Sequence, residues 1–269
     1  MPKKRRPLSV RQPPDGRPKN RLLALLPDED FHHLRRHLET VPVRGKQVFH
    51  KAGERLRHVY FLNGGVCSLT TVLSQGAIVE AATIGDYGFV GIEAFLRDDA
   101  VSLSEAIMQV PDTDAERLSV KAFRRALAER PALRTLLGRY LQVVIGQMIQ
   151  TTACNVHHSV QERCVRWLLM AHDHMHRQNF TLSHAFLAEM LGASRPTVSE
   201  VAGKLQAAGL IRYSHGRVTV VDRKGLEAAS CECYAALRAH FDSLQPSRQA
   251  DHTSSYAQRP PNCRQADRP

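Results

Sequence analysis

The residues from 182 to 205 limit the possible structures of this chain more than any other segment. Ser183 is suited to begin a helix, because its hydroxyl can accept a hydrogen bond from an unpaired amide of the first turn. Gly192 is suited to end that helix, and Ser194 followed by Pro196 is typical of the start of another. Apolar side chains recur at helical spacing in both stretches: Ala185, Leu187, Ala188, Leu191, Val198, Val201 and Leu205. The segment therefore predicts two short helices joined by a tight turn.

Two alternating stretches follow this helix pair. Residues 211–213 and 218–221 alternate apolar and polar side chains on either side of His215 and Gly216, a pattern typical of a β-hairpin. A capped helix pair alone also fits an ordinary helical hairpin, but a helix pair followed by a β-hairpin has the order of a winged helix-turn-helix. Such a motif places its second helix in the major groove of double-stranded DNA. The sequence therefore predicts a DNA-binding protein.

The net charge of +11 supports a polyanionic partner, although most of the excess lies far from this motif. Residues 1–21 carry eight Lys and Arg against one acidic residue, whereas residues 22–158 carry fifteen of each kind. We expect residues 1–20 to form a disordered basic tail, which either makes nonspecific phosphate contacts or is simply solvated. Residues 243–269 are expected to form a second disordered tail.

No segment has the pattern of a membrane span or a signal peptide. There is no run of about 18 apolar residues, and the N-terminus lacks an apolar signal core. We therefore expect a soluble, cytoplasmic protein. Its cysteines should then be reduced thiols, and they are Cys67, Cys154, Cys164, Cys231, Cys233 and Cys263.

The first half of the chain has a β pattern. Short alternating stretches at residues 48–49, 59–62, 66–72, 78–84 and 107–110 are separated by glycines, which predicts an antiparallel β-barrel or roll. A short helical lead-in over residues 21–39 precedes them, and residues 118–130 return to helical spacing. The predicted fold class is therefore α+β.

The longest predicted helix runs over residues 131–155. It is apolar on more than one side, so it is either an internal core helix or a helix that also packs on a second copy of the chain. We favour the dimer, because helix-turn-helix proteins commonly bind two half-sites. The expected dimer contacts are Leu133, Leu137, Tyr140, Val144, Met148 and Thr151. Ser159 and Glu162 then have the spacing of a capping box that opens another helix.

The whole order resembles one family, the transcription regulators related to the cyclic-AMP receptor protein and the fumarate-nitrate regulator (Crp/Fnr family). The specific matches are Gly53-Glu54, the strand at residues 59–62, Gly64-Gly65, residues 187–192 and residues 194–198. The resemblance implies a sensory roll similar to cyclic-nucleotide-binding domains (residues 21–130), a dimerisation helix and hinge (131–158) and a winged helix-turn-helix (159–242).

The resemblance also implies how the protein acts. It implies a homodimer that regulates transcription from a palindromic operator, has RNA polymerase as a further partner, and is not an enzyme. The residues expected to contact DNA are Ser183, His184, Arg195, Pro196, Thr197, Ser199, Glu200, Lys204, His215 and Arg217. Among them, Arg195 can pair with guanine and Glu200 can accept a hydrogen bond from cytosine.

The departures from the family pattern concern the sensed signal. Members that bind cyclic nucleotides carry an Arg-Ser or Arg-Thr pair whose arginine neutralises the phosphate, but residues 99–110 contain no arginine. We therefore expect no binding of cyclic AMP, and Gly85, Tyr87 and Glu93 are only tentative positions for another effector. The first cysteine is Cys67, so the N-terminal iron–sulfur site of oxygen-sensing members is also not expected.

Two further groups of residues could bind a metal ion. His172, His174 and His176 form an HxHxH pattern, for which a solvated helix end is the simpler interpretation. Cys231 and Cys233 are two apart on an expected helix and should point away from each other, which favours ordinary packing over a metal site or a disulfide. No metal and no cofactor are therefore predicted.

Three alternatives remain open at this point. A metal-dependent oxygenase would need two histidines and a carboxylate at one metal, yet the roll offers only His50 and His58. No catalytic motif is present, and no catalytic residue is predicted. A thiol-based redox-responsive regulator of the same fold stays open, since thiol reactivity depends on pKa. An interaction module without DNA binding is opposed by the intact caps and Arg195.

Overall fold

The computed structural model describes residues 18–111, 114–175 and 177–245. Most of the two expected tails lies outside the described residues, as do His176 and Cys263. The inner ends of the predicted tails are packed. The Asn20 side chain is fully buried and donates hydrogen bonds to the carbonyl oxygens of Leu62, at 2.6 Å, and Gly88, at 3.0 Å. Leu244 is also buried, so the folded part extends beyond the predicted bounds of 21 and 242.

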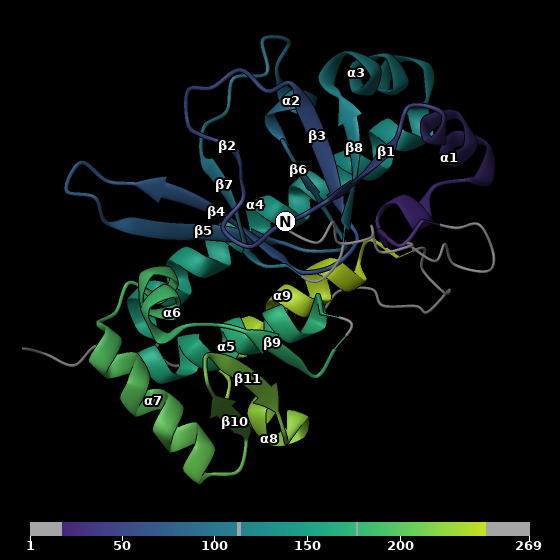
Figure 1. Cartoon of the computed structure of the whole chain (residues 1–269). Helices are drawn as coiled ribbons and strands as arrows, with labels where there is room; N and C mark the ends of the chain where they lie inside the picture. Colours follow the sequence, from purple (N-terminus) through teal and green to yellow (C-terminus); the bar gives the residue numbers. More distant parts are fainter. Residues whose placement is uncertain (1–17, 112–113, 176, 246–269) are drawn as a thin grey trace, which may run out of the picture.

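The N-terminal half is a roll of two antiparallel four-stranded sheets, as the sequence predicts (Figure 1). One sheet has the strand order β1-β8-β3-β6 and the other β2-β7-β4-β5. A 3-10 helix, Leu23–Leu25, and α1, Asp28–Arg35, precede them. The strands are β1 (Glu39–Pro42), β2 (Val48–His50), β3 (His58–Leu62), β4 (Val66–Val72), β5 (Ile78–Ile84), β6 (Phe89–Val90), β7 (Glu105–Val110) and β8 (Asp114–Ser119).

The predicted strands correspond to β2, β3, β4, β5 and β7, and the sequence missed β1, β6 and β8. Strand β8 pairs with β1 and β3, but its charged residues hide the alternation that marks a strand. The short helix α2, Glu93–Leu96, follows β6. The expected helix at 118–130 begins two residues later, as α3 (Val120–Glu129), because the Ser119 hydroxyl accepts a hydrogen bond from the Ala122 amide.

Helix α4, Pro131–His157, crosses the roll and shares its core (Figure 1). Five of the six side chains that the sequence assigned to a dimer interface belong to or pack against this core instead, and the sixth, Thr151, is also buried within the protomer. Leu133, Leu137, Tyr140 and Val144 are at most 1% exposed. Tyr140 reaches so far into the roll that a Cβ atom on Gly88 would lie 2.1 Å from its hydroxyl oxygen. The predicted dimer contacts are therefore wrong, because this side of α4 packs against the roll of its own protomer.

The C-terminal half begins with α5, Val160–Asp173, opened by the predicted capping box of Ser159 and Glu162. The rest of the winged helix follows in the predicted order, with β9 added to the hairpin to make a sheet of order β10-β11-β9. Its elements are β9 (Asn179–Thr181), α6 (His184–Leu191), α7 (Arg195–Ala207), β10 (Ile211–Ser214), β11 (Arg217–Val220), α8 (Arg223–Ala228) and α9 (Glu232–Asp242).

The two halves are packed against each other. Helix α6 contacts β5, and α9 contacts both α4 and α5. Val66 and Val110 of the roll belong to the same buried cluster as Trp167 and Leu168 of α5. No helix within the described ranges is both long and apolar enough to cross a membrane.

Candidate DNA-binding surface and interdomain contact

The helix pair α6–α7 has the caps that its sequence predicts. The Ser183 hydroxyl accepts a hydrogen bond from the Phe186 amide at 3.1 Å, and the Ser194 hydroxyl accepts one from the Thr197 amide at 3.2 Å. Gly192 ends α6 in the left-handed region at φ 57°, where a side chain would be strained. Local hydrogen bonds thus fix the angle at which α7 leaves the turn.

Helix α7 presents one face to the protein and the other to solvent. Val198, Val201 and Leu205 are buried, and α7 forms an outer edge of the molecule (Figure 1). Most of the predicted DNA contacts lie on the exposed surface of α6, α7 and the hairpin. The exposed ones are Ser183, Arg195, Pro196, Ser199, Glu200, Lys204, His215 and Arg217, whereas His184 and Thr197 are half-buried.

His184 connects the three parts of this surface. Its Nδ1 lies 2.8 Å from the Ser199 hydroxyl on α7, and its ring packs on Tyr213 of β10 at 4.2 Å between centroids. Burial, and secondarily the charge of Arg195, lower the pKa of His184. The imidazole is therefore neutral at neutral pH, which makes it a support for Ser199 and the hairpin.

The β-hairpin of β10 and β11 is held against α6 by specific contacts. The Tyr213 hydroxyl donates a hydrogen bond to the Leu182 carbonyl oxygen at 2.5 Å. The turn places His215 at φ 49° and Gly216 at φ 73°, the conformation of a tight hairpin turn. The hairpin therefore projects His215 and Arg217 beside α7 as a wing.

Arginines on this surface are free to meet an external anion. Among the described residues, Arg195, Arg212 and Arg217 form no salt bridge. Glu200, in contrast, has an ion-pair partner. Lys204 Nζ lies 2.7 Å from its Oε1 and lowers the pKa of the Glu200 carboxyl. The sequence prediction omitted Arg212, which is exposed on β10. Its outward place in the hairpin alternation could have identified it.

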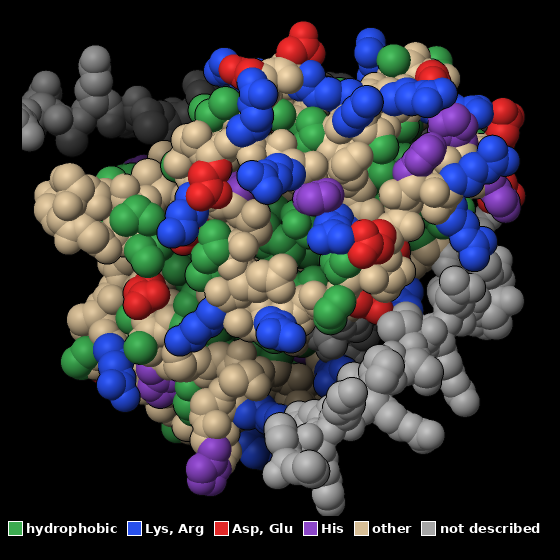
Figure 2. All heavy atoms as spheres, turned by 45° about the horizontal axis from the view of Figure 1, so that its top comes forward, with side chains coloured by type: hydrophobic (Ala, Val, Ile, Leu, Met, Phe, Trp, Pro, Cys, Tyr) green, Lys and Arg blue, Asp and Glu red, His purple; other side chains and the backbone are tan. Residues whose placement is uncertain are grey.

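On the surface of the roll, some basic side chains are paired with acidic ones, whereas others, such as Arg44 and Arg57, form no salt bridge among the described residues. Figure 2 shows a face on which Lys and Arg side chains are spread among acidic, histidine and hydrophobic ones. Arginines of the roll and of α3 pair with neighbouring carboxylates: Arg97 with Asp99 at 2.7 Å, Arg124 with Asp98 at 2.9 Å, and Arg125 with Glu129 at 2.8 Å. These partners neutralise part of the positive charge on this side of the molecule.

Comparison with known proteins agrees with this geometry. Residues 162–229 match the model of the Crp-like helix-turn-helix domain. The global nitrogen regulator of Synechococcus elongatus is 27% identical over 188 residues, which cover 66% of this chain and 82% of that protein. The transcriptional regulator SdrP of Thermus thermophilus is 26% identical over 179 residues, covering 61% and 79%. The chain belongs to the Crp/Fnr family of transcriptional regulators.

Solved structures share the fold of this Crp/Fnr regulator. FixK2 from Bradyrhizobium japonicum superposes with a TM-score of 0.61 at 16% identity, over 72% of this chain and 98% of that one. The c-di-GMP responsive regulator CLP from Xanthomonas campestris gives 0.58 at 16% identity, over 73% and 100%. The family consists of transcription regulators that bind DNA and not of enzymes.

In this Crp/Fnr regulator, two buried carboxylates of the roll bond to the DNA-binding half. The first is Glu80 on β5, which accepts hydrogen bonds from the Trp167 indole at 3.0 Å and from the Ser68 hydroxyl. It is 6% exposed, and burial raises its pKa to about 7. Trp167 lies on α5, so this contact joins the roll to the first helix of the DNA-binding half.

The second buried carboxylate is Asp86, which lies between Arg21 and His174. Its oxygens are 2.9 Å from Arg21 Nε and 3.1 Å from His174 Nδ1. His174 comes so close to the roll that a Cβ atom on Gly85 would lie 2.1 Å from its ring. Of the histidines expected at a solvated helix end, the two that the structure describes are not fully solvated, because His174 is 4% exposed and His172 is half-buried. We call Glu80, Gly85, Asp86, Trp167 and His174 the interdomain contact.

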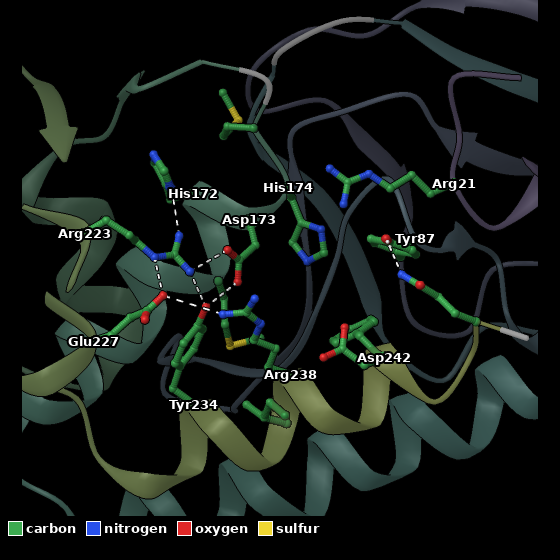
Figure 3. Close-up of a pocket in the computed structure, with 15 residues that line it drawn as sticks. Arg21, Tyr87, His172, Asp173, His174, Arg223, Glu227, Tyr234, Arg238 and Asp242 are labelled. Atoms are coloured by element: carbon green, nitrogen blue, oxygen red, sulfur yellow. Dashed lines mark hydrogen bonds and ion pairs between the residues drawn. The ribbon is translucent and has the colours of Figure 1, made fainter. Parts of the chain in front are cut away.

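A cavity of about 620 Å³ lies beside this contact, bounded by Arg21, Tyr87, α5, α8 and α9 (Figure 3). Arg223 occupies one wall, with Asp173 and Glu227 each 2.7 Å away, and Tyr234 donates a hydrogen bond to Asp173 at 2.9 Å. On the other wall, the Arg21 guanidinium packs over the Tyr87 ring at 4.6 Å. The cavity is thus lined by charges of both signs, most of them already paired.

The three tentative effector residues do not form one site. Gly85 lies against His174 and Tyr87 lines the cavity, both between the two halves. Glu93 is buried on α2 within the roll, where its Oε1 accepts hydrogen bonds from the Ser102 hydroxyl at 3.1 Å and the Leu103 amide at 3.0 Å. The sequence grouped them because they are close along the chain, but β6 carries Glu93 away from the contact.

Proposed function

We propose that this regulator binds a nearly palindromic operator as a homodimer, with α7 of each protomer in a major groove. The observation that carries the proposal is the capped and exposed N-terminus of α7, where Arg195 has no ion-pair partner among the described residues. The wing adds Arg212 and Arg217 beside it. In such motifs the N-terminal residues of the second helix contact base edges.

A role for each exposed side chain follows from its chemistry. Arg195 would donate two hydrogen bonds to guanine O6 and N7, and Glu200 would accept one from cytosine N4 after release from Lys204. Arg212, His215 and Arg217 on the wing would contact phosphates, which position the protein without reading sequence. Ser183, the N-cap of α6, would make a further phosphate contact.

A second face of α4 supports the dimer. Ile145, Ile149 and Val156 are 57%, 67% and 73% exposed, which is unusual for large apolar side chains on a helix that closes a core. They belong to a stripe with alternating steps of three and four residues, the spacing of a coiled-coil seam. The stripe consists of Thr135, Gly138, Gln142, Ile145, Ile149, Thr152 and Val156. This face would pack against its own copy in a partner protomer.

Regulation without cyclic AMP is also part of the proposal. Ser102 stands where the sequence pattern of cyclic-AMP-binding members has its phosphate-binding pair, and its hydroxyl bonds to Glu93 and to His50 Nδ1 at 2.7 Å. A cyclic phosphate there would meet a carboxylate and no arginine from residues 99–110. As a transcription regulator, the protein would act in the cytoplasm and have RNA polymerase as a further partner.

The redox-responsive alternative has weaker support. Burial raises the pKa of Cys154 and of Cys164 to about 12 and raises that of Cys67 further. Thiols with raised pKa are poor nucleophiles at neutral pH, because the thiolate is the reactive form. The other alternative, an interaction module that does not bind DNA, is also less well supported. Such a module would not need the intact helix caps or the unpaired arginines of α7 and the wing.

Substitution on the exposed stripe tests the proposed dimer. Ile149→Asp should convert the dimer to a monomer in sedimentation equilibrium. It should also weaken binding to an inverted-repeat duplex by about 100-fold or more, since two linked half-sites bind far more tightly than one. Leu103→Asp is the matched control, because Leu103 is 70% exposed but lies in the roll. A wild-type monomer at micromolar concentration, or an unchanged Ile149→Asp dimer, would refute the proposal.

A further inference from the structure

Four side chains that commonly bind metal ions meet where the DNA-binding half joins α4. Cys154 and His158 are four residues apart at the C-terminal end of α4, and Cys231 and Cys233 lie at the start of α9. Their ligand atoms all lie within 4.8 Å of one another. The three cysteines are buried and form a cluster distinct from the two larger hydrophobic cores.

The backbone explains why the sequence did not predict this cluster. Residues two apart on a helix diverge, and that rule argued against a site with Cys231 and Cys233. Cys231, however, precedes the helix and has an extended backbone, at φ −72° and ψ 162°. The two thiols therefore converge on α4, where Cys154 and His158 share a helical face and are linked by a backbone hydrogen bond of 3.1 Å.

Two of the separations between ligand atoms match those of a tetrahedral zinc site, and all of them are within 4.8 Å. With Zn–S bonds of about 2.3 Å and Zn–N bonds of about 2.0–2.1 Å, two sulfur ligands should lie about 3.8 Å apart and a sulfur and a nitrogen about 3.5 Å apart. Cys154 Sγ and Cys231 Sγ are 3.7 Å apart, and Cys233 Sγ and His158 Nδ1 are 3.5 Å apart. Both pairs already have the spacing that one shared ion imposes.

We propose that Cys154, His158, Cys231 and Cys233 bind one Zn²⁺ ion per chain. Three thiolates and an imidazole are the ligand set of structural zinc sites, whereas Ca²⁺ and Mg²⁺ prefer oxygen. An iron–sulfur cluster would need its ligands spread around several atoms, and these four converge on one point. On binding, the three thiols release their protons to solvent and each sulfur donates an electron pair to zinc.

Groups around the four ligands orient them for this role. His158 uses Nδ1 toward the cysteines, and its Nε2 lies 3.2 Å from the Glu232 carboxylate, the arrangement of a carboxylate–histidine–zinc triad. The Gln150 amide nitrogen lies 3.0 Å from Cys233 Sγ and can donate a hydrogen bond to a thiolate. Glu232 is thus a positioning residue, since it acts through His158.

The location gives the ion a structural effect. It would join the end of α4 to the start of α9, and α9 packs on both α4 and α5. The ion would therefore fix the hinge between the long helix and the DNA-binding half. Any effect on DNA affinity rests on the proposed function, but metal binding is measured without DNA, so the two proposals can fail separately.

Cobalt binding tests the site directly. The full chain, reduced and freed of metal with a chelator, is titrated with Co²⁺ and then with Zn²⁺. We expect tetrahedral cobalt bands and thiolate-to-cobalt charge transfer that saturate at one ion per chain and vanish when Zn²⁺ displaces Co²⁺. Saturation without thiolate bands, or no metal binding by protein whose thiols are all shown to be reduced by mass spectrometry, would overturn the proposal.

Variants identify the ligands. Cys154→Ser and Cys231→Ser, made separately, should each weaken the thiolate bands and lower the affinity for the ion, while Cys164→Ser, a change of a buried cysteine outside the cluster, should leave both unchanged. Glu232 is 79% exposed, so Glu232→Gln should fold and weaken zinc affinity by about 10–100-fold in competition with a chelator. Full binding by Cys154→Ser and Cys231→Ser would contradict the assignment, as would unchanged affinity in Glu232→Gln.

Discussion

The recognition surface and the interdomain contact use polar side chains in opposite ways. On α7 and the wing, Arg195, Arg212 and Arg217 are exposed, and none has an ion-pair partner in the described part of the chain. Between the two halves, Glu80 and Asp86 are buried, and each bonds to a side chain of the other half. The first arrangement leaves charge available for an external polyanion, and the second fixes geometry within the chain.

This difference predicts two separate classes of variants. Changes on the recognition surface should alter DNA binding and leave the free energy of unfolding nearly unchanged, because the affected groups make few contacts with the protein. Changes at the interdomain contact should mainly lower the free energy of unfolding. They leave a buried polar group without its hydrogen-bond partner or force side chains into overlap.

Adding one methyl group should strongly destabilise the protein at Gly85 but not at Gly203. Gly85→Ala places a Cβ atom 2.1 Å from the His174 ring and should lower the free energy of unfolding by about 1–3 kcal/mol. Gly203→Ala on α7 meets nothing within 4 Å and should raise it by up to about 1 kcal/mol. Urea unfolding of both variants measures the difference. Equal effects at the two sites, or no relief of Gly85→Ala by His174→Ala, would contradict the close packing of the contact.

The pH dependence of stability should report on Glu80. Because its pKa rises from 4.5 to about 7 on folding, the folded chain holds this proton to higher pH than the unfolded chain does. The stability that Glu80 contributes through this proton is fully present below about pH 4.5 and is lost as the pH rises through about 7. Wild-type stability should therefore fall relative to Glu80→Gln by up to about 1.4 kcal/mol per pH unit over that range. Glu189→Gln, an exposed change on α6, should follow the wild type. If the free energy of unfolding varied with pH in the same way for the wild type and Glu80→Gln, the raised pKa of a buried Glu80 would be refuted.

A smaller effect should separate two exposed arginines. Arg217→Ala on the wing should weaken binding to all duplexes alike and lower the slope of log K against log salt by about 1. Arg125→Ala on α3 removes a charge already paired with Glu129 and should leave the slope unchanged. Fluorescence anisotropy at several salt concentrations measures both. A loss of slope in Arg125→Ala would place DNA on the roll as well.

Some regions could be predicted from the sequence because their signals are local. Ser183, Gly192 and Ser194 act within three residues of themselves, so the helix-turn-helix could be identified without any tertiary contact. The strands that alternate were found for the same reason. For α4, apolar residues on several sides showed that the helix was buried, but not which stripe faced the roll.

The interdomain contact and the cysteine cluster could not be predicted in this way. Trp167 and Glu80 are 87 residues apart in sequence, and Cys154 and Cys231 are 77 apart. No periodicity links such positions, because they meet only after both halves have folded. His174 looked like a solvated helix end for the same reason, since its partner Asp86 lies in a different half.

The central claim is that α7 reads the DNA sequence, and selection of binding sites from random duplexes tests it most directly. The wild type should enrich an inverted repeat whose half-sites are about one helical turn apart. Arg195→Ala should relax preference at one base pair in each half-site and lose about 1–3 kcal/mol of binding to the selected site, with little change on random DNA. Enrichment of the same repeat with undiminished preference by Arg195→Ala, or no enrichment by the wild type, would contradict the claim.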